Sequence, residues 1–286
     1  MPANSIVGLA KGSIRYDTVL KSLRLIEESV KERIARSMRI VIKPDFFFTK
    51  QGMSASVDAV RAVLDFVLEF TNKKITIAEG LFSGSEIQPV FHKAGLHELH
   101  EGYGLKYVDL NRDEFVTFLP GSDALPLAKG ARFSVRVAKT ILNSDFRISL
   151  GVPKLVGVRT SARFSAAMAN IAVGSMISNG KPIEKNGKEK LMSSAYYDSA
   201  VVEILKVVKP SLAVIDGSVA VVNKKSLGMN FCVASADGVA ADAVAAAAFG
   251  DSLKKKIRKQ RYLDLCTKAG LGQSSLTKIA IVGEKL

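Results

Sequence analysis

The segment SLAVIDGSVAVV (Ser211–Val222) is followed along the chain by ADGVAADAVAAAAFG (Ala236–Gly250) and AGLGQSSLTKIAIVGEKL (Ala269–Leu286). The first and last segments contain short apolar runs typical of buried strands, whereas the alanine-rich middle segment is typical of a closely packed helix. Asp237 can cap that helix and Gly250 can end it. The carboxyl-terminal part therefore predicts strands and helices in alternation, the pattern of an α/β protein.

The same alternation extends through the rest of the chain. Apolar runs predict strands at Arg39–Ile42, Lys74–Ala78, Lys106–Leu110, Lys139–Asn143, Ala213–Ile215, Phe231–Ala234 and Ile279–Val282. Helical spacing of apolar residues predicts helices at Val57–Phe70, Gln88–Tyr103, Ser193–Val208, Gly238–Phe249 and Leu253–Lys268. This order favours one α/β domain over residues 1–286, with a largely parallel sheet and helices on both faces. A second, smaller lobe formed by residues 112–200 is the alternative organisation.

The composition is that of a globular protein with a large excess of positive charge. Of the 286 residues, 48% are hydrophobic, and the net charge is +14. Neither a run of about 18 apolar residues nor an export-signal pattern is present, so we expect a cytoplasmic protein that does not enter a membrane. The charge indicates attraction to anionic ligands or polyanions. Because tryptophan is absent and tyrosines number only six, a solubilising surface is favoured over a nucleic-acid interface.

Neither the cysteines nor the histidines form a recognisable metal motif. Cys232 and Cys266 are far apart and belong to no CxxC pair, which fits a reducing compartment. His97 and His100 would share one helix face, but HELHE is not the HExxH motif of zinc enzymes. The sequence therefore predicts no metal site.

The three carboxyl-terminal segments together resemble the signature of domain-of-unknown-function family 362, and the resemblance extends from Lys43 to Glu284. IKPD at Ile42–Asp45 is similar to the family's lysine–proline–asparagine element. Many members of the family carry ferredoxin-like cysteine motifs. Those motifs are absent here, so no iron–sulfur cluster held by this chain is expected. The resemblance implies an α/β fold but no particular reaction.

The segment Gly151–Gly174 contains the densest group of candidate ligand-binding residues. Lys154, Arg159 and Arg163 lie among small residues, near Asn170, which predicts a basic pocket for a carboxylate or phosphate. Residues that match the family pattern are Pro153, Lys154, Leu155 and Asn170. The family's lysine–threonine–histidine element falls on residues 156–158 and its second lysine on Ala169, so a histidine and two lysines are missing. The chemistry of relatives is then either lost or moved to Arg159 and Arg163.

Two further candidates follow a predicted strand directly. Lys43 is the last residue before the rigid Pro44, and Asp45 comes next. Ligands bind at the carboxyl ends of parallel strands, so Lys43 and Asp45 are expected to contact an anionic ligand there. The alternative is an exposed lysine at a strand end.

Three aspartates in the carboxyl-terminal part complete the candidate site. Asp216 follows the strand-like LAVI and would orient the ligand or exchange protons, although Asp-Gly is also a common turn. Asp242 is expected, like Asp216, to orient the ligand or exchange protons. It lies inside a small-sided helix, so its carboxylate needs a partner such as Lys43 or Lys154, or its pKa rises. The alternative for Asp242 is a structural ion pair. Asp237 is an N-cap that could also contact the ligand.

We therefore expect a cytoplasmic protein that binds a small anionic metabolite or cofactor at the carboxyl edge of its sheet. Whether it is an enzyme, with altered or lost chemistry, is left open by the sequence. The alternative function is a polyanion-binding module, with nucleic acid as its partner. It would use the basic helix containing KKKIRKQR at Lys254–Arg261. For that helix, a solvated face is the default interpretation.

Overall fold

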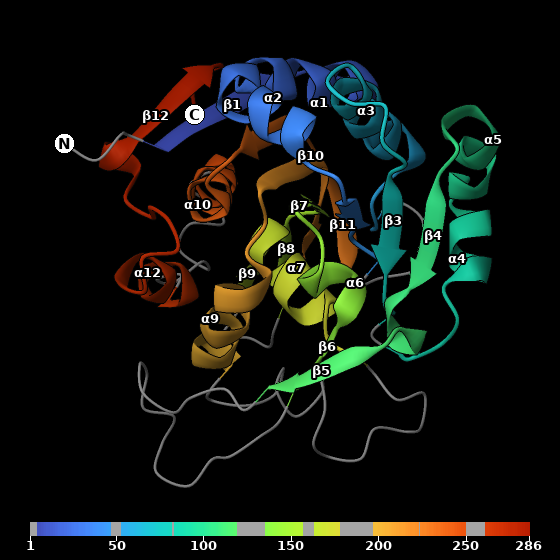
Figure 1. The fold of residues 1–286 in the computed structure, drawn as a ribbon. Helices are drawn as coiled ribbons and strands as arrows, with labels where there is room; N and C mark the ends of the chain where they lie inside the picture. Colours follow the sequence, from blue (N-terminus) through green and yellow to red (C-terminus); the bar gives the residue numbers. More distant parts are fainter. Residues whose placement is uncertain are drawn as a thin grey trace, which may run out of the picture.

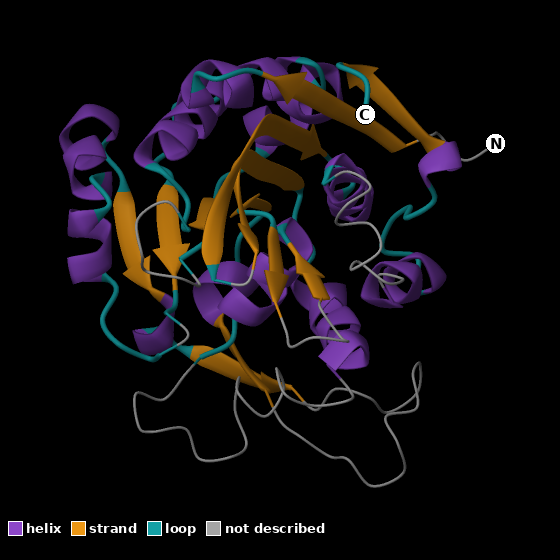
Figure 2. Ribbon diagram, turned by 180° about the vertical axis from the view of Figure 1, so that it is seen from behind, coloured by secondary structure: helices purple, strands orange, loops and turns teal. Residues whose placement is uncertain are grey.

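A computed structural model of the chain describes residues 5–46, 53–81, 83–118, 135–156, 163–177, 197–222, 224–249 and 261–286 (Figures 1 and 2). The side chains of Val156, Arg163 and Arg261 are not described. The main sheet contains, in spatial order, β12 (Ile279–Gly283), β1 (Ser5–Lys11), β11 (Lys225–Ser235), β10 (Leu212–Val222), β7 (Phe146–Gly151), β2 (Ile40–Pro44), β3 (Thr76–Glu79) and β4 (Lys106–Asp109). Beside this path, β8 (Lys154–Val156) pairs with β10 and with β9 (Arg163–Ser165).

The main sheet is largely parallel, as the sequence predicts. Only β11 is antiparallel to its neighbours β1 and β10 on this path, and every other neighbouring pair is parallel. Since two antiparallel steps restore the direction, β12, β1, β10, β7, β2, β3 and β4 all run the same way. Their carboxyl ends therefore lie along one edge of the sheet, where α/β proteins bind ligands.

Helices cover both faces of the sheet, which confirms the predicted α/β class. One face carries α1 (Arg15–Arg24), α2 (Glu27–Arg36), α3 (Val57–Leu68), α4 (Gln88–Lys93) and α5 (Leu99–Tyr103). The other carries α7 (Ala167–Gly174), α9 (Tyr197–Val208), α10 (Gly238–Ala248) and α12 (Arg261–Lys268). Alternate residues of β10 join the two cores, because Leu212 packs with the first group and Ala213 with the second.

Local sequence explains where two of these helices begin. Ser56 caps α3 by accepting a hydrogen bond from the Ala59 amide at 3.2 Å. Asp237 caps α10 by accepting from the amides of Val239 and Ala240, at 3.0 and 3.1 Å. The predicted N-cap is thus confirmed.

Two predicted elements differ from the structure. Lys139–Asn143 was expected to be a strand, but Lys139–Leu142 forms the short helix α6, and the strand follows at Phe146–Gly151. The helix expected at Gln88–Tyr103 is interrupted at Gly95, whose φ of 74° belongs to the left-handed region. It is divided into α4, the 3₁₀ helix η1 (Leu96–Glu98) and α5.

The middle of the chain takes part in two sheets. Within residues 112–200, β7 occupies the centre of the main sheet. β5 (Phe115–Phe118) and β6 (Val135–Ala138) form a separate two-stranded antiparallel sheet. Further 3₁₀ helices in the described part of the chain are η2 (Leu110–Arg112) and η3 (Leu276–Lys278). The boundary of a second lobe remains a prediction. None of the described helices has the length and apolarity needed to cross a membrane.

Candidate functional site

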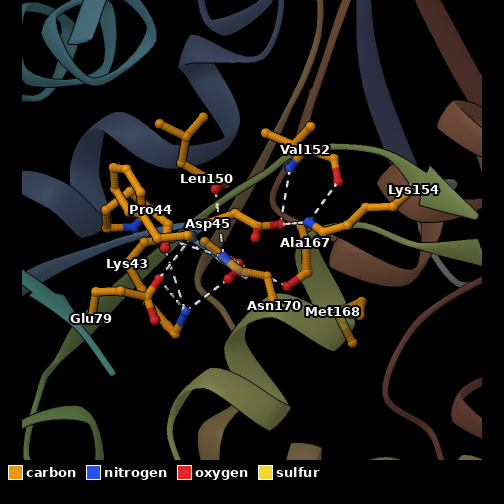
Figure 3. Close-up of polar contacts among 12 residues, drawn as sticks. Lys43, Pro44, Asp45, Glu79, Leu150, Val152, Lys154, Ala167, Met168 and Asn170 are labelled. Carbon is orange, nitrogen blue, oxygen red and sulfur yellow. Dashed lines mark hydrogen bonds and ion pairs between the residues drawn. The ribbon is translucent and has the colours of Figure 1, made fainter. Parts of the chain in front are cut away.

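A buried cluster of charged and polar side chains lies where β2, β3 and β7 end (Figure 3). β2 supplies Lys43 and is followed by Asp45, β3 ends with Glu79, and β7 leads to Lys154. Asn170 enters from α7 on the overlying face. The predicted ligand-binding residues Lys43, Asp45, Lys154 and Asn170 are thereby brought together.

Lys43 lies at the centre of this cluster. Its Nζ donates to Glu79 Oε2 at 2.9 Å, to Asn170 Oδ1 at 2.7 Å and to the Pro44 carbonyl at 3.4 Å. The side chain is only 1% exposed. Because an ammonium group has three donors, all of those of Lys43 are occupied by the chain itself.

A second ion pair lies beside the first. Lys154 Nζ is paired with Asp45 Oδ2 and also donates to the Val152 carbonyl at 3.1 Å. The same Asp45 oxygen accepts from the Val152 amide at 3.3 Å. The cluster therefore contains two lysines and two carboxylates, so its charges balance in the interior.

Asn170 connects the ion pairs to α7. Its Nδ2 donates to the Lys43 carbonyl at 3.1 Å and to Ser149 Oγ at 3.0 Å. Ser149 in turn donates to the Ala167 carbonyl at 2.7 Å. This network fixes α7 against the sheet, and it satisfies polar atoms that burial would otherwise penalise.

Burial shifts two groups of the cluster toward their neutral forms. It raises the pKa of Glu79, although the attraction of Lys43 opposes the rise. It lowers the pKa of Lys154, although the attraction of Asp45 opposes the fall. Desolvation is therefore the larger effect at both positions, and the pairing limits its consequence.

Gly174 makes room for the Lys43 ammonium. A Cβ at this position would overlap Lys43 Cε and Nζ. Gly174→Ala is therefore expected to lower the free energy of unfolding by about 1–3 kcal/mol in chemical denaturation, because the held lysine cannot move aside.

Gly102→Ala is the matched control, since a Cβ there meets nothing within 4 Å. Helix propensity alone predicts a gain of about 0.5–1 kcal/mol for both substitutions. If the stability of Gly174→Ala were unchanged or raised, the Lys43 side chain would be free to move aside, contrary to our inference.

Asp242 anchors the amino terminus of α7 and has no lysine partner among the described residues. Its Oδ1 accepts from the Ala167 amide at 2.9 Å, and its Oδ2 accepts from the Tyr262 hydroxyl at 2.6 Å. Complete burial raises the pKa of Asp242 to about 7, even though these hydrogen bonds favour the ionised form. The expected alternatives were a lysine partner or a raised pKa, and the structure shows the raised pKa.

Asp216 lies apart from the cluster, on the face covered by α1. Its Oδ2 is 3.2 Å from Arg15 Nε, and its Oδ1 accepts from the Ser218 amide at 3.0 Å. The Asp216 side chain is buried, whereas that of Arg15 is 24% exposed. The pair is electrostatic, since within the described residues neither Arg15 Nε nor Asp216 Oδ2 has a hydrogen-bond partner. Among these residues, no hydrogen bond or ion pair uses the two terminal nitrogens of Arg15.

A groove of about 410 Å³ opens beside Arg15, beyond the carboxyl ends of β1, β2 and β3. Its lining includes Arg15, Phe46, Ser54, Ser56, Val57 and Lys93. Phe46 links the groove to the buried cluster, because its amide donates to Glu79 Oε2 at 3.3 Å. The Ala55 amide donates to the Asp45 carbonyl at 2.8 Å and holds the other wall.

Asp237 contacts the chain through both of its oxygens. Besides capping α10, it accepts from Ser5 Oγ at 2.6 Å and from the Gln273 amide at 2.9 Å. These bonds connect α10 to the first strand and to the segment before β12. A ligand-binding role for Asp237 remains a prediction.

Some predicted residues lie outside the described part of the chain. Arg159 and most of Lys254–Arg261 are not described, and of Arg163 only the backbone is, in β9. Where the chain is described, no group of three or more histidine, cysteine, aspartate or glutamate residues is arranged to hold a metal ion.

Sequence reasoning missed Glu79, Ser149, Arg15 and Tyr262. Glu79 could have been found from the sequence, because it directly follows the predicted strand that comes after the strand of Lys43. A carboxylate at that place is a suitable partner for the lysine. Arg15 had none, because β1 and α1 were not predicted and β1 reaches β10 only through the antiparallel β11.

Comparison with known proteins identifies the family but no established function. A search of curated proteins finds no match. Among solved structures, the lactate racemase apoprotein from Thermoanaerobacterium thermosaccharolyticum is 13% identical, with a TM-score of 0.44, covering 83% of this chain and 55% of that one. A protein from Thermotoga maritima is 10% identical, with a TM-score of 0.36, covering 86% and 59%. The chain thus spans less than two thirds of either structure. Residues 40–247 match the family described as Domain of unknown function (DUF362), and because this match covers more than half of the chain, the protein belongs to that family.

Proposed function

We propose that this protein binds a small organic anion, a carboxylate or phosphate ester, in the groove beside Arg15. The observation that carries the proposal is the pair formed by Arg15 and the buried Asp216. Arg15 Nε lies 3.2 Å from Asp216 Oδ2, an ion pair without a hydrogen bond. The two terminal nitrogens of a guanidinium have the planar geometry that carboxylates and phosphates recognise. A second cation, Lys93, lines the same groove and has no ion pair with the described residues.

The start of α3 adds further donors. The amides of Val57 and Asp58 have no acceptor within the helix, whereas that of Ala59 donates to Ser56 Oγ. The positive end of the helix dipole favours an anion, and the Asp58 carboxylate, which also lines the groove, is paired with Arg61 at 3.5 Å. Apolar contacts come from Phe46 and Val57, so the preferred ligand has a small apolar body beside its charged group.

Lys43 and Lys154 act behind this groove rather than as its anion contacts. Both are buried and paired with carboxylates, so neutralising a ligand would require an ion pair to open. Together with Asp45 and Asn170 they hold the segment that carries Phe46. Asp216 is a positioning residue for Arg15.

The site is proposed to function in the cytoplasm. The unpaired thiols of Cys232 and Cys266 are consistent with a reducing compartment. For polyanion binding, the described residues offer no observation that favours it over the groove.

Arg15→Gln and Lys93→Gln test the proposal in thermal-shift titrations with succinate, malate, inorganic phosphate and glycerol phosphate. A ligand at 100 times its dissociation constant should stabilise the wild-type protein by about 2.7 kcal/mol. Loss of a charged hydrogen bond in Arg15→Gln should weaken binding by about 1.5–3 kcal/mol, or roughly 10- to 150-fold.

Lys225→Gln, which removes an exposed lysine elsewhere, is the control. If no anion of this panel stabilises the wild type, or if Arg15→Gln and Lys93→Gln bind as well as Lys225→Gln, the proposal is wrong.

A further inference from the structure

β12 is an open edge of the main sheet. It pairs with β1, and no other described strand lies on its outer side (Figure 1). The Glu284 amide donates to the Leu9 carbonyl at 2.8 Å, which shows which residues of β12 turn their backbone groups toward β1. In a parallel pair alternate residues bond to the neighbour, so the amides and carbonyls of Ile279, Ile281 and Gly283 point away from β1.

The composition of β12 does not protect this edge. Its sequence, IAIVG, contains neither a charge nor a proline, the usual devices that prevent edge pairing. The opposite edge differs, because β4 reads KYVD and has a charge at each end. Apolar side chains also lie exposed beside β12, namely Ile6 on β1 at 43% and Leu276 on η3 at 41%.

Charges flanking β12 are complementary to a second copy of the same strand. Antiparallel self-pairing about a two-fold axis at Ile281 places Ile279 opposite Gly283 of the other copy. The same register places Lys278 opposite Glu284 at both ends of the pair. Lys278 is exposed and has no ion pair among the described residues. The Glu284 side chain is 42% exposed and its Oε1 already pairs with Lys21 at 3.0 Å, so Lys278 of the other copy would join this exposed pair.

We propose that the protein forms a two-fold symmetric homodimer in which the β12 strands pair antiparallel about Ile281 and join the two sheets into one. The outward backbone groups of Ile279, Ile281 and Gly283 then bond to the other copy. This dimer is independent of anion binding in the groove.

Sedimentation equilibrium of the full chain tests the dimer. The wild type should sediment as a dimer, and Ile281→Pro should raise the dissociation constant at least tenfold, because it removes an outward amide. Proline is tolerated on an edge strand where its missing N–H faces away from the neighbour.

Charge reversal tests the register with little effect on the monomer, because Glu284→Lys breaks only the exposed pair with Lys21. Lys278→Glu and Glu284→Lys should each weaken the dimer, and the double variant Lys278→Glu/Glu284→Lys should restore it. Lys225→Glu makes the same charge change on an exposed lysine of β11 and should leave the dimer intact. Circular dichroism and the melting temperature report whether each variant is folded.

Three results would overturn the proposal. The wild type could be monomeric at about 100 µM, a concentration at which even a micromolar dimer is mostly formed. Folded Ile281→Pro could remain a dimer, which would place the interface elsewhere. The double charge reversal could fail to restore the dimer affinity that the single reversals lower, which would exclude this register.

Discussion

Lys43→Met is expected to lower the free energy of unfolding by about 3–5 kcal/mol. The substitution keeps the apolar length of the side chain but removes the ammonium that pairs with Glu79 at 2.9 Å. Glu79 is buried, and burial already raises its pKa, so without Lys43 it must either remain ionised at high cost or take up a proton. Asn170 loses a donor in the same step.

Chemical denaturation at neutral pH measures this loss, and two variants show its cause. Lys139→Met breaks an ion pair of similar length, in which Lys139 Nζ lies 2.8 Å from Glu114 Oε2. The Lys139 side chain is 44% exposed and the Glu114 side chain 79% exposed. That exposed pair should contribute less than about 1 kcal/mol. Lys43→Met/Glu79→Gln removes both charges and should recover most of the loss of Lys43→Met. If Lys43→Met and Lys139→Met lowered the free energy of unfolding equally, burial would not be what makes the Lys43–Glu79 pair important for stability.

Much of the fold could be predicted because its elements carry local signals. The helix of α10 has an N-cap at Asp237 and a uniform small-residue composition, and its predicted start is confirmed. β2 and β3 appear in the sequence as short apolar runs. Signals of this kind depend only on residues close in the sequence, so they can be recognised without knowledge of the tertiary structure.

β7 was missed because its polar residues serve tertiary contacts. Arg147 interrupts the apolar run, yet its guanidinium donates to the carbonyls of Val207 and Lys209 at the end of α9. Ser149 interrupts it again and bonds to Ala167 and Asn170. The apolar residues of Lys139–Leu142 offered a stronger pattern, and a run this short does not separate a strand from a single helical turn.

Four residues of the buried cluster were predicted from the sequence, but its other members and its geometry were not. The cluster forms because three parallel strands end together, which brings Lys43, Asp45 and Lys154 close to Asn170 of α7. The position of a residue after an apolar run can indicate such a strand end. The mutual pairing of these side chains could not be predicted, because it depends on burial and on Glu79. Arg15 reaches Asp216 only through the order of strands in the sheet, which local patterns do not encode.

The stability of the protein should fall as pH rises from about 4 to about 7 because of Asp242. Its pKa is about 7 in the folded state, whereas the ordinary pKa of an aspartate, which applies to the unfolded chain, is 3.8. Between these values the folded state holds a proton that the unfolded state has released, so raising the pH favours unfolding. Above pH 7 both states are ionised and the loss is complete, at about 4 kcal/mol.

Asp242→Asn isolates this contribution from that of other carboxylates, including Glu79, whose raised pKa acts in the same direction. Asparagine keeps an oxygen that can accept from the Ala167 amide, but it does not titrate. The stability difference between wild type and Asp242→Asn should therefore shift by about 4 kcal/mol toward the variant between pH 4 and pH 8.

Tyr262→Phe provides an independent check with the carboxylate retained. The Tyr262 hydroxyl donates to Asp242 Oδ2 at 2.6 Å and favours its ionised form. Without that hydroxyl the pKa of Asp242 should rise further, and the loss of stability should extend to higher pH than in the wild type. Parallel pH profiles of wild type and Asp242→Asn would show that Asp242 is ionised throughout, and α7 would then be anchored by a buried charge rather than by a protonated acid.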